Sequence, residues 1–345
     1  MKKTTLYGSL FAAIIVASNV FVGFAQTDEI EDISCYFTVL SDQEATDQLV
    51  AEELIANAPS PGPRTTQLTD AFKKVAEAYA CIGDYQSSIE AYDQAIRMDS
   101  DWATLYYSRG RVVRVTGDYE NALADFTTAL ELDPEWASII FEIGYIELLQ
   151  GEYETCVETY TDGLAIEEDA IAYNNRGVCY DNLDDVENAM ADYERATEIN
   201  PEYALAYDNL GLIYHNERDY EAALGYYSQA IELDPERISF RLDRIDVLLD
   251  MQEWDDAVED LEFVLENSPD TADVYYYYGF YYFSIGEYAE AVPYYQTYLE
   301  LDPTGYFADW ADQDLEDLAD ILGDDFGSSG NTGLSGGSGG ISGGK

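Results

Sequence analysis

The sequence predicts an all-α protein, an α-solenoid of seven similar helix–turn–helix units closed by a C-terminal capping helix. Three observations lead to this prediction. The pattern repeats about every 34 residues, small side chains recur at fixed positions of the repeat, and no alternating strand pattern occurs. The best-defined unit runs from 204 to 237 and reads ALAYDNLGLIYHNERDYEAALGYYSQAIELDPER. Positions in a unit are counted from Ala204 as position 1.

Seven units in this register cover residues 69–305. Their predicted bounds are 69–102, 103–136, 137–169, 170–203, 204–237, 238–271 and 272–305. No single unit can bury its apolar face alone, so the fold requires that successive units stack.

Three positions of the repeat show how its two helices pack. Position 8 is small in six of seven units: Ala76, Gly110, Gly144, Gly177, Gly211, Ile245 and Gly279. Position 20 is small throughout: Ser88, Ala122, Cys156, Ala189, Ala223, Ala257 and Ala291. Position 24 is large: Tyr92, Phe126, Tyr160, Tyr193, Tyr227, Leu261 and Tyr295. Small residues let the two helices approach closely, and the large residue fills the core between them.

The connections carry turn residues. Gly-Asp-Tyr or a close variant separates the two helices, as at 83–85, 117–119 and 286–288. Glycine accepts the left-handed backbone that ends a helix, and the acid favours the N-terminus of the next one. Units tend to finish with Asp-Pro, as at Pro134 and Pro235, because proline stops a helix.

These residues resemble the tetratricopeptide repeat (TPR) signature in all seven units, over about two-thirds of the chain. The departures are Ser100 and Glu168 in place of proline, Ile245 in place of glycine and Tyr298 in place of alanine. The resemblance implies a right-handed superhelix with an inner groove, lined by the first helix of each unit, that binds peptides.

The segments outside the repeats have other expected roles. Residues 1–25 read as a signal peptide, with Lys2 and Lys3 before an apolar stretch and a cleavage site after Ala25. Residues 26–68 hold one expected helix and a Pro-rich linker. Residues 306–326 form the capping helix, and the Gly/Ser-rich 327–345 reads as a disordered tail. The protein is thus expected outside the cytoplasm, extracellular or periplasmic; an uncleaved segment would instead anchor it in the membrane.

Export permits disulfides among Cys35, Cys81, Cys156 and Cys179. Cys156 and Cys179 fall on sequence-adjacent helices, and Cys35 could then pair with Cys81. The alternative is four free, buried thiols. No CxxC spacing favours a metal site.

The charge restricts the partners. The chain has 70 Asp and Glu against 16 Lys and Arg, a formal net charge of −54. Such a surface repels nucleic acid and favours basic proteins or peptides. Weak, diffuse Ca²⁺ binding and homo-oligomers are further alternatives, and no cofactor is expected.

Three sets of residues are candidates for the partner-binding groove. Asn175 and Asn209 hold position 6 of consecutive units, where amides can bind a peptide backbone; asparagine is also common at this position. Arg111 and Arg114 could bind a partner's carboxylate or pair with acids of the chain itself.

The third set is aromatic. Tyr276, Tyr277, Phe280 and Phe283 are expected to face the groove of the last unit, unless the capping helix or a second copy covers them. His215, the only histidine, is also expected to face the groove.

The sequence therefore predicts a non-enzymatic scaffold that binds a peptide or protein segment. One histidine rules out multi-His metal sites, and no Gly-rich phosphate loop occurs. The alternatives are a structural surface protein that self-associates through divalent cations, and a cell-wall glycan binder that uses the aromatic residues of the last unit.

Overall fold

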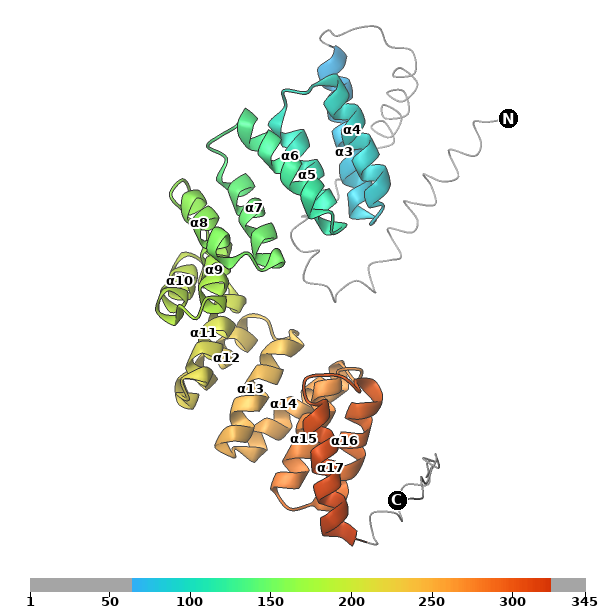
Figure 1. Cartoon of the computed structure of the whole chain (residues 1–345), viewed down its shortest axis with the longest axis vertical. Coiled ribbons are helices and arrows are strands. Elements are labelled where there is room, and N and C mark those ends of the chain that lie inside the picture. Colours follow the sequence, from blue (N-terminus) through green and yellow to red (C-terminus); the bar gives the residue numbers. More distant parts are fainter. Residues whose placement is uncertain (1–63, 324–345) are drawn as a thin grey trace, which may run out of the picture. The chain divides into compact units, whose positions relative to one another are not determined.

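The computed structural model describes residues 64–323, and all 15 elements in this range are helices. They follow one another as helix–turn–helix pairs and end in a single capping helix (Figure 1). The prediction of an all-α fold of the TPR type is thus confirmed. The predicted signal peptide 1–25, the expected helix at 42–57, Cys35 and the tail 327–345 lie outside the described residues.

The chain divides into two compact units. The first ends at Ala189 and the second begins at Met190, so the boundary falls inside α10 (Val186–Ile199). In the first unit the helices are α3 (Arg64–Cys81) with α4 (Tyr85–Met98), α5 (Ala103–Val115) with α6 (Tyr119–Leu132), α7 (Ala137–Gln150) with α8 (Tyr153–Leu164), and α9 (Ala170–Asn182).

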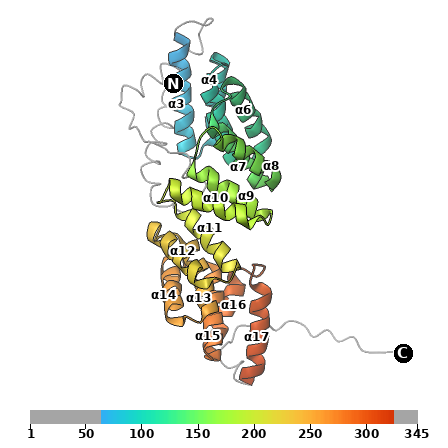
Figure 2. The same ribbon diagram turned by 90° about the vertical axis from the view of Figure 1, so that its left-hand side faces the viewer.

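The second unit continues the same pattern (Figure 2). Its helices are α11 (Ala204–Asn216) with α12 (Tyr220–Leu233), α13 (Ile238–Met251) with α14 (Trp254–Asn267), α15 (Ala272–Ser284) with α16 (Tyr288–Leu301), and α17 (Ala308–Leu322).

The turn between the two helices of each pair has one backbone conformation throughout. Position 15 has positive φ in all seven repeats: Gly83, Gly117, Gly151 and Gly286, but also Asp184, Arg218 and Gln252. The aspartate after it often caps the second helix, because its carboxylate accepts a hydrogen bond from a backbone N–H. Asp84 accepts from Ser87 N at 3.1 Å, and Asp118 from Asn121 N at 3.2 Å.

The two helices of a pair meet where glycine faces an aromatic ring. A Cβ built on Gly211 would lie 2.7 Å from ring carbons of Tyr227, and one on Gly279 would lie 2.7 Å from Tyr295. Ile245 replaces this glycine in α13, and the facing residue there is the smaller Leu261; both are fully buried. The exchange keeps the total volume between the helices similar, which is what a close-packed interior requires.

The last pair is closed by α17. Its Ala311 and Leu318 are fully buried, and Phe307, just before the helix, is 9% exposed. Tyr298, where other repeats have a small residue, is fully buried, and its hydroxyl accepts a hydrogen bond from the Phe307 N–H at 2.9 Å. The tyrosine thus bonds to the capping segment.

Cys156 of α8 and Cys179 of α9 form a disulfide, with their Cα atoms 6.4 Å apart. Both side chains are fully buried. Cys81 is also disulfide-bonded, and its predicted partner, Cys35, lies outside the described residues.

The contact between Gly211 and Tyr227 can be tested with a matched glycine. We expect Gly211→Ala to destabilise the protein by about 1–3 kcal/mol, because the new methyl group displaces the buried Tyr227 ring. Gly225, in the middle of α12, has no atom within 4 Å of an added Cβ. Gly225→Ala should therefore stabilise α12 by up to about 1 kcal/mol. Thermal unfolding by circular dichroism measures both; equal effects of the two changes would contradict the packing argument.

Candidate partner-binding face

In the first unit the two candidate arginines bind a carboxylate of the chain itself. Arg111 Nε lies 2.9 Å from Glu142 Oε1, and Arg114 Nε lies 3.1 Å from Glu142 Oε2. Arg114 is only 6% exposed, and its guanidinium lies over the Tyr145 ring at 4.8 Å. Of the two alternatives that the sequence left open, the structure thus has the internal one, in which a carboxylate of α7 pairs with both arginines.

The two candidate asparagines lie on different sides of the division between the two compact units, Asn175 in the first and Asn209 in the second. Asn175 on α9 is half-buried, and its side-chain amide donates a hydrogen bond to the Tyr160 hydroxyl at 3.1 Å. Asn209 on α11 is half-buried and also has a partner in the structure. Their binding of a peptide backbone remains a prediction.

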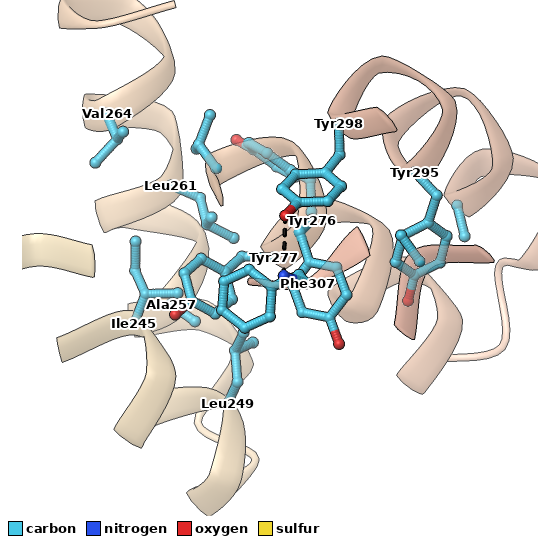
Figure 3. Close-up of a cluster of buried hydrophobic side chains, with 14 of the residues drawn as sticks. Ile245, Leu249, Ala257, Leu261, Val264, Tyr276, Tyr277, Tyr295, Tyr298 and Phe307 are labelled. Atoms are coloured by element: carbon cyan, nitrogen blue, oxygen red, sulfur yellow. Dashed lines mark hydrogen bonds between the residues drawn. The ribbon is translucent and has the colours of Figure 1, made fainter. Parts of the chain in front are cut away.

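Two of the four aromatic candidates belong to the core. Tyr276 and Tyr277 are each 7% exposed. The Tyr276 ring stacks on Phe307 with centroids 4.2 Å apart and planes 2° from parallel, and Tyr277 meets the same ring edge-on (Figure 3). Phe307, just before the capping helix, covers both tyrosines, which is the alternative that the sequence left open. A glycan-binding role loses Tyr276 for the same reason.

Phe280 and Phe283 are half-buried and line an open hollow of about 620 Å³ in the second unit. The hollow lies where α13 and α15 end and where α14 and α16 begin. Leu249, Trp254, Ile285 and Tyr288 supply the rest of its apolar wall, and Asp250 lies at the same hollow. Its volume is in the usual range for ligand sites.

The helices α11 and α13 carry four carboxylates, Asp208, Asp243, Asp246 and Asp250, of which Asp250 lines the hollow. His215 Nε2 lies 3.9 Å from Asp246 Oδ2 and 3.7 Å from Asp250 Oδ2, too far for hydrogen bonds. The side chains of Asp246 and Asp250 are 49% and 50% exposed. Across residues 64–323 neither of these two aspartates has a lysine or arginine as an ion-pair partner. We name Asp246 and Asp250 the aspartate pair.

The other two carboxylates lie deeper, and burial decides their protonation. Burial, helped by the negative charge of Asp243, raises the pKa of Asp208 to about 8, while Arg237 opposes the shift. Burial and the charge of Asp246 raise the pKa of Asp243 to about 6. Tyr227, fully buried, is close enough to Asp243 and Asp208 for their charges to raise the pKa of its hydroxyl further. Neither Tyr227 Oη nor Asp208 Oδ1 has a hydrogen-bond partner within the described chain.

Sequence reasoning missed the four aspartates and Trp254. The aspartates are hidden among 70 acidic residues, so composition could not single them out. Trp254 occupies position 17, where five other repeats have tyrosine, so it reads as one more core residue.

Two family models match the repeats of this chain. One model of the tetratricopeptide repeat matches residues 76–137, 107–155 and 242–306, and a second one matches residues 170–203 and 204–237. Together these segments cover more than half of the chain. The chain belongs to the tetratricopeptide repeat family. No curated protein matches the sequence.

Solved structures of TPR proteins share the fold of this chain. A tetratricopeptide repeat protein from Parabacteroides merdae is 20% identical, with a TM-score of 0.55 over 72% of this chain and 98% of its own. PilW, a type IV pilus biogenesis factor, is 17% identical, with a TM-score of 0.54 over 59% and 94%. The APC/C hetero-tetramer Cut9-Hcn1 is 15% identical, with a TM-score of 0.57 over 82% and 57%. At these identities the likeness concerns the TPR fold alone.

Between residues 64 and 323, every helix is too short or too polar to span a membrane. In the same range, no group of three or more His, Cys, Asp or Glu side chains could hold a metal ion. Binding of Ca²⁺ therefore has no defined site between residues 64 and 323.

The raised pKa of Asp208 predicts how the stability of the protein depends on pH. The folded state keeps a proton on Asp208 up to about pH 8, whereas the unfolded chain loses it near its ordinary pKa of 3.8. The free energy of unfolding therefore falls as pH rises from the unfolded to the folded pKa of Asp208. Above the folded pKa this group lowers it no further. We expect Asp208→Asn to stabilise the protein on the order of 2 kcal/mol more at about pH 8 than at about pH 5.

The control is Glu259→Gln, which removes one exposed charge from α14. Thermal unfolding midpoints at several pH values compare the two variants. A stability gain of Asp208→Asn that does not change with pH would show that Asp208 is already ionised in the folded protein.

Proposed function

We propose that this TPR protein is a non-enzymatic scaffold outside the cytoplasm that binds a peptide or protein segment along the first helices of its repeats. TPR repeats as a family support protein–protein interaction. The observation that carries the proposal for this chain lies in the second unit. There α13 presents two half-exposed carboxylates without a lysine or arginine partner, beside a hollow to which α15 contributes aromatic side chains.

The contrast with the first unit supports this assignment. Arg111 and Arg114 share Glu142, so both guanidinium groups already have an acidic partner within the chain. Within residues 64–323 the aspartate pair has no lysine or arginine partner, and His215 Nε2 lies 3.9 Å from Asp246 Oδ2 and 3.7 Å from Asp250 Oδ2. Half-exposed carboxylates without an arginine partner are better candidates for binding than arginines that already pair with an acid.

Binding can be tested with an array of unrelated peptides and the full chain. We expect a subset of peptides to bind, and hydrogen exchange of the complexes to show protection on α11, α13 and α15 rather than on α12, α14 and α16. Asn209→Ala should weaken binding about three- to tenfold if its amide holds the peptide backbone. No binding by any peptide, or protection confined to the second helices, would overturn the proposed function.

The location is proposed on two grounds. Residues 1–25 have the composition of a signal peptide, and the Cys156–Cys179 disulfide is typical of oxidising compartments. We expect the mature chain to begin at Gln26. Its mass should show Cys156 and Cys179 joined as a disulfide, which opens only when a reductant is added. N-terminal sequencing and mass spectrometry of the natural protein measure both, and free thiols with an intact Met1 would place it in the cytoplasm.

A further inference from the structure

The hollow in the second unit has an apolar wall and an acidic edge. Trp254, Phe280, Phe283 and Tyr288 are half-buried, and Ile285 is 40% exposed, so apolar surface remains accessible. The rings hold one another in place: Phe283 meets Tyr288 edge-on with centroids 5.6 Å apart. A wall of fixed aromatic rings suits one bulky apolar side chain, since its burial there costs little reorganisation.

The acidic edge is the aspartate pair. Asp250 lines the hollow itself, and Asp246 precedes it by one turn of α13, on the same side of the helix. Two carboxylates one turn apart repel each other. Burial raises the pKa of Asp246, His215 opposes this shift, and the charge of Asp250 adds to it. A cation placed between them would relieve this repulsion.

No lysine or arginine of the second unit supplies that cation. The segment 190–323 contains five arginines and no lysine, and Arg218, in the turn after α11, pairs with neither aspartate. Arg241 and Arg244 both bond to the buried Asp260 of α14, at 2.7 Å each. Arg237 bonds to Asp234 at 3.1 Å, and Arg195 to Glu198 at 2.7 Å. His215 stays beyond hydrogen-bond distance of both aspartates.

We propose that the hollow and the aspartate pair form one binding site for a peptide with a basic residue next to a bulky apolar residue. The apolar side chain occupies the hollow against Phe283 and Trp254, and the lysine or arginine lies against Asp246 and Asp250. The proposal rests on the proposed scaffold function and names its partner. Charge complementarity selects this occupant: a second copy of so acidic a chain would bring more negative charge to the aspartates.

The experiment measures fluorescence anisotropy of labelled ten-residue Gly/Ser peptides at about 0.15 M NaCl. The probes carry Lys-Phe, Arg-Phe, acetyl-lysine-Phe or Lys-Ser at their centre, and the protein is the full chain. We expect the Lys-Phe and Arg-Phe peptides to bind best. Loss of either the charge or the ring should weaken binding about three- to tenfold.

Matched variants distinguish binding at this site from attraction by the net negative charge of the chain. Asp246→Asn with Asp250→Asn removes the pair, and we expect this variant to bind Lys-Phe no better than acetyl-lysine-Phe. Glu262→Gln with Glu266→Gln removes two exposed charges with the same spacing from α14 and should keep the preference. Ile285→Ser, at an exposed position of the hollow, should lower affinity for Lys-Phe but not for Lys-Ser; circular dichroism confirms that each variant is folded.

Three results would overturn the proposal. Equal losses in the α13 and α14 charge variants would show attraction by net charge alone. Self-association of the chain that is lost with Ile285→Ser, measured by sedimentation, would assign the hollow to a second copy. Failure of all four probes while array peptides still protect α11, α13 and α15 would reject this partner but keep the scaffold function. Failure of both experiments would reject the scaffold function as well.

Discussion

The fold depends on how closely the two helices of each repeat approach. Gly211 and Tyr227, or Gly279 and Tyr295, are in contact because the glycine leaves room for the ring and the ring fills that room. The constraint acts on their summed volume rather than on either residue, since Ile245 with Leu261 satisfies it as well. Every other feature of the repeat, from the left-handed turn residue to the stacking of successive pairs, presupposes this spacing.

The same contact connects the core to the partner-binding face. A tyrosine at position 24 packs against the first helix of its own repeat. Its hydroxyl reaches the residue at position 6 in the following repeat. Asn175 donates to the Tyr160 hydroxyl in this way, and Tyr92 bonds to Ser108. In the second unit the equivalent of this polar residue is Asp243, and Tyr227 Oη has no hydrogen bond. Position 6 therefore decides whether the buried hydroxyl is satisfied within the chain, which makes it a core position as well as a surface one.

The fold could be predicted because its determinants are local and repeated, whereas the site could not. Seven recurrences of a small residue at position 8 or 20 outweigh a departure such as Ile245. The positive φ of Asp184, Arg218 and Gln252 could not be predicted from these residue types, because the neighbouring repeats and not these residues impose the turn. Glu142 lies one repeat away from Arg111, and Phe307 lies beyond the last repeat, so the ion pair and the cover over Tyr276 depend on stacking geometry that one repeat does not contain.

The positions of the arginines explain which carboxylates of this acidic chain have a basic partner. Arg109 bonds to Asp125 at 2.8 Å, and Arg244 bonds to Asp260 at 2.7 Å, so position 7 of the first helix neutralises position 23 of the second. These carboxylates are buried and would be costly without a partner. Other arginines pair with exposed acids, such as Arg195 with Glu198. The side chains of Asp246 and Asp250 are about half exposed, so water can solvate them without a lysine or arginine partner. The charge of the aspartate pair attracts any cation, but the aromatic hollow beside it can distinguish one basic peptide from another, so specificity arises from the apolar half of the site.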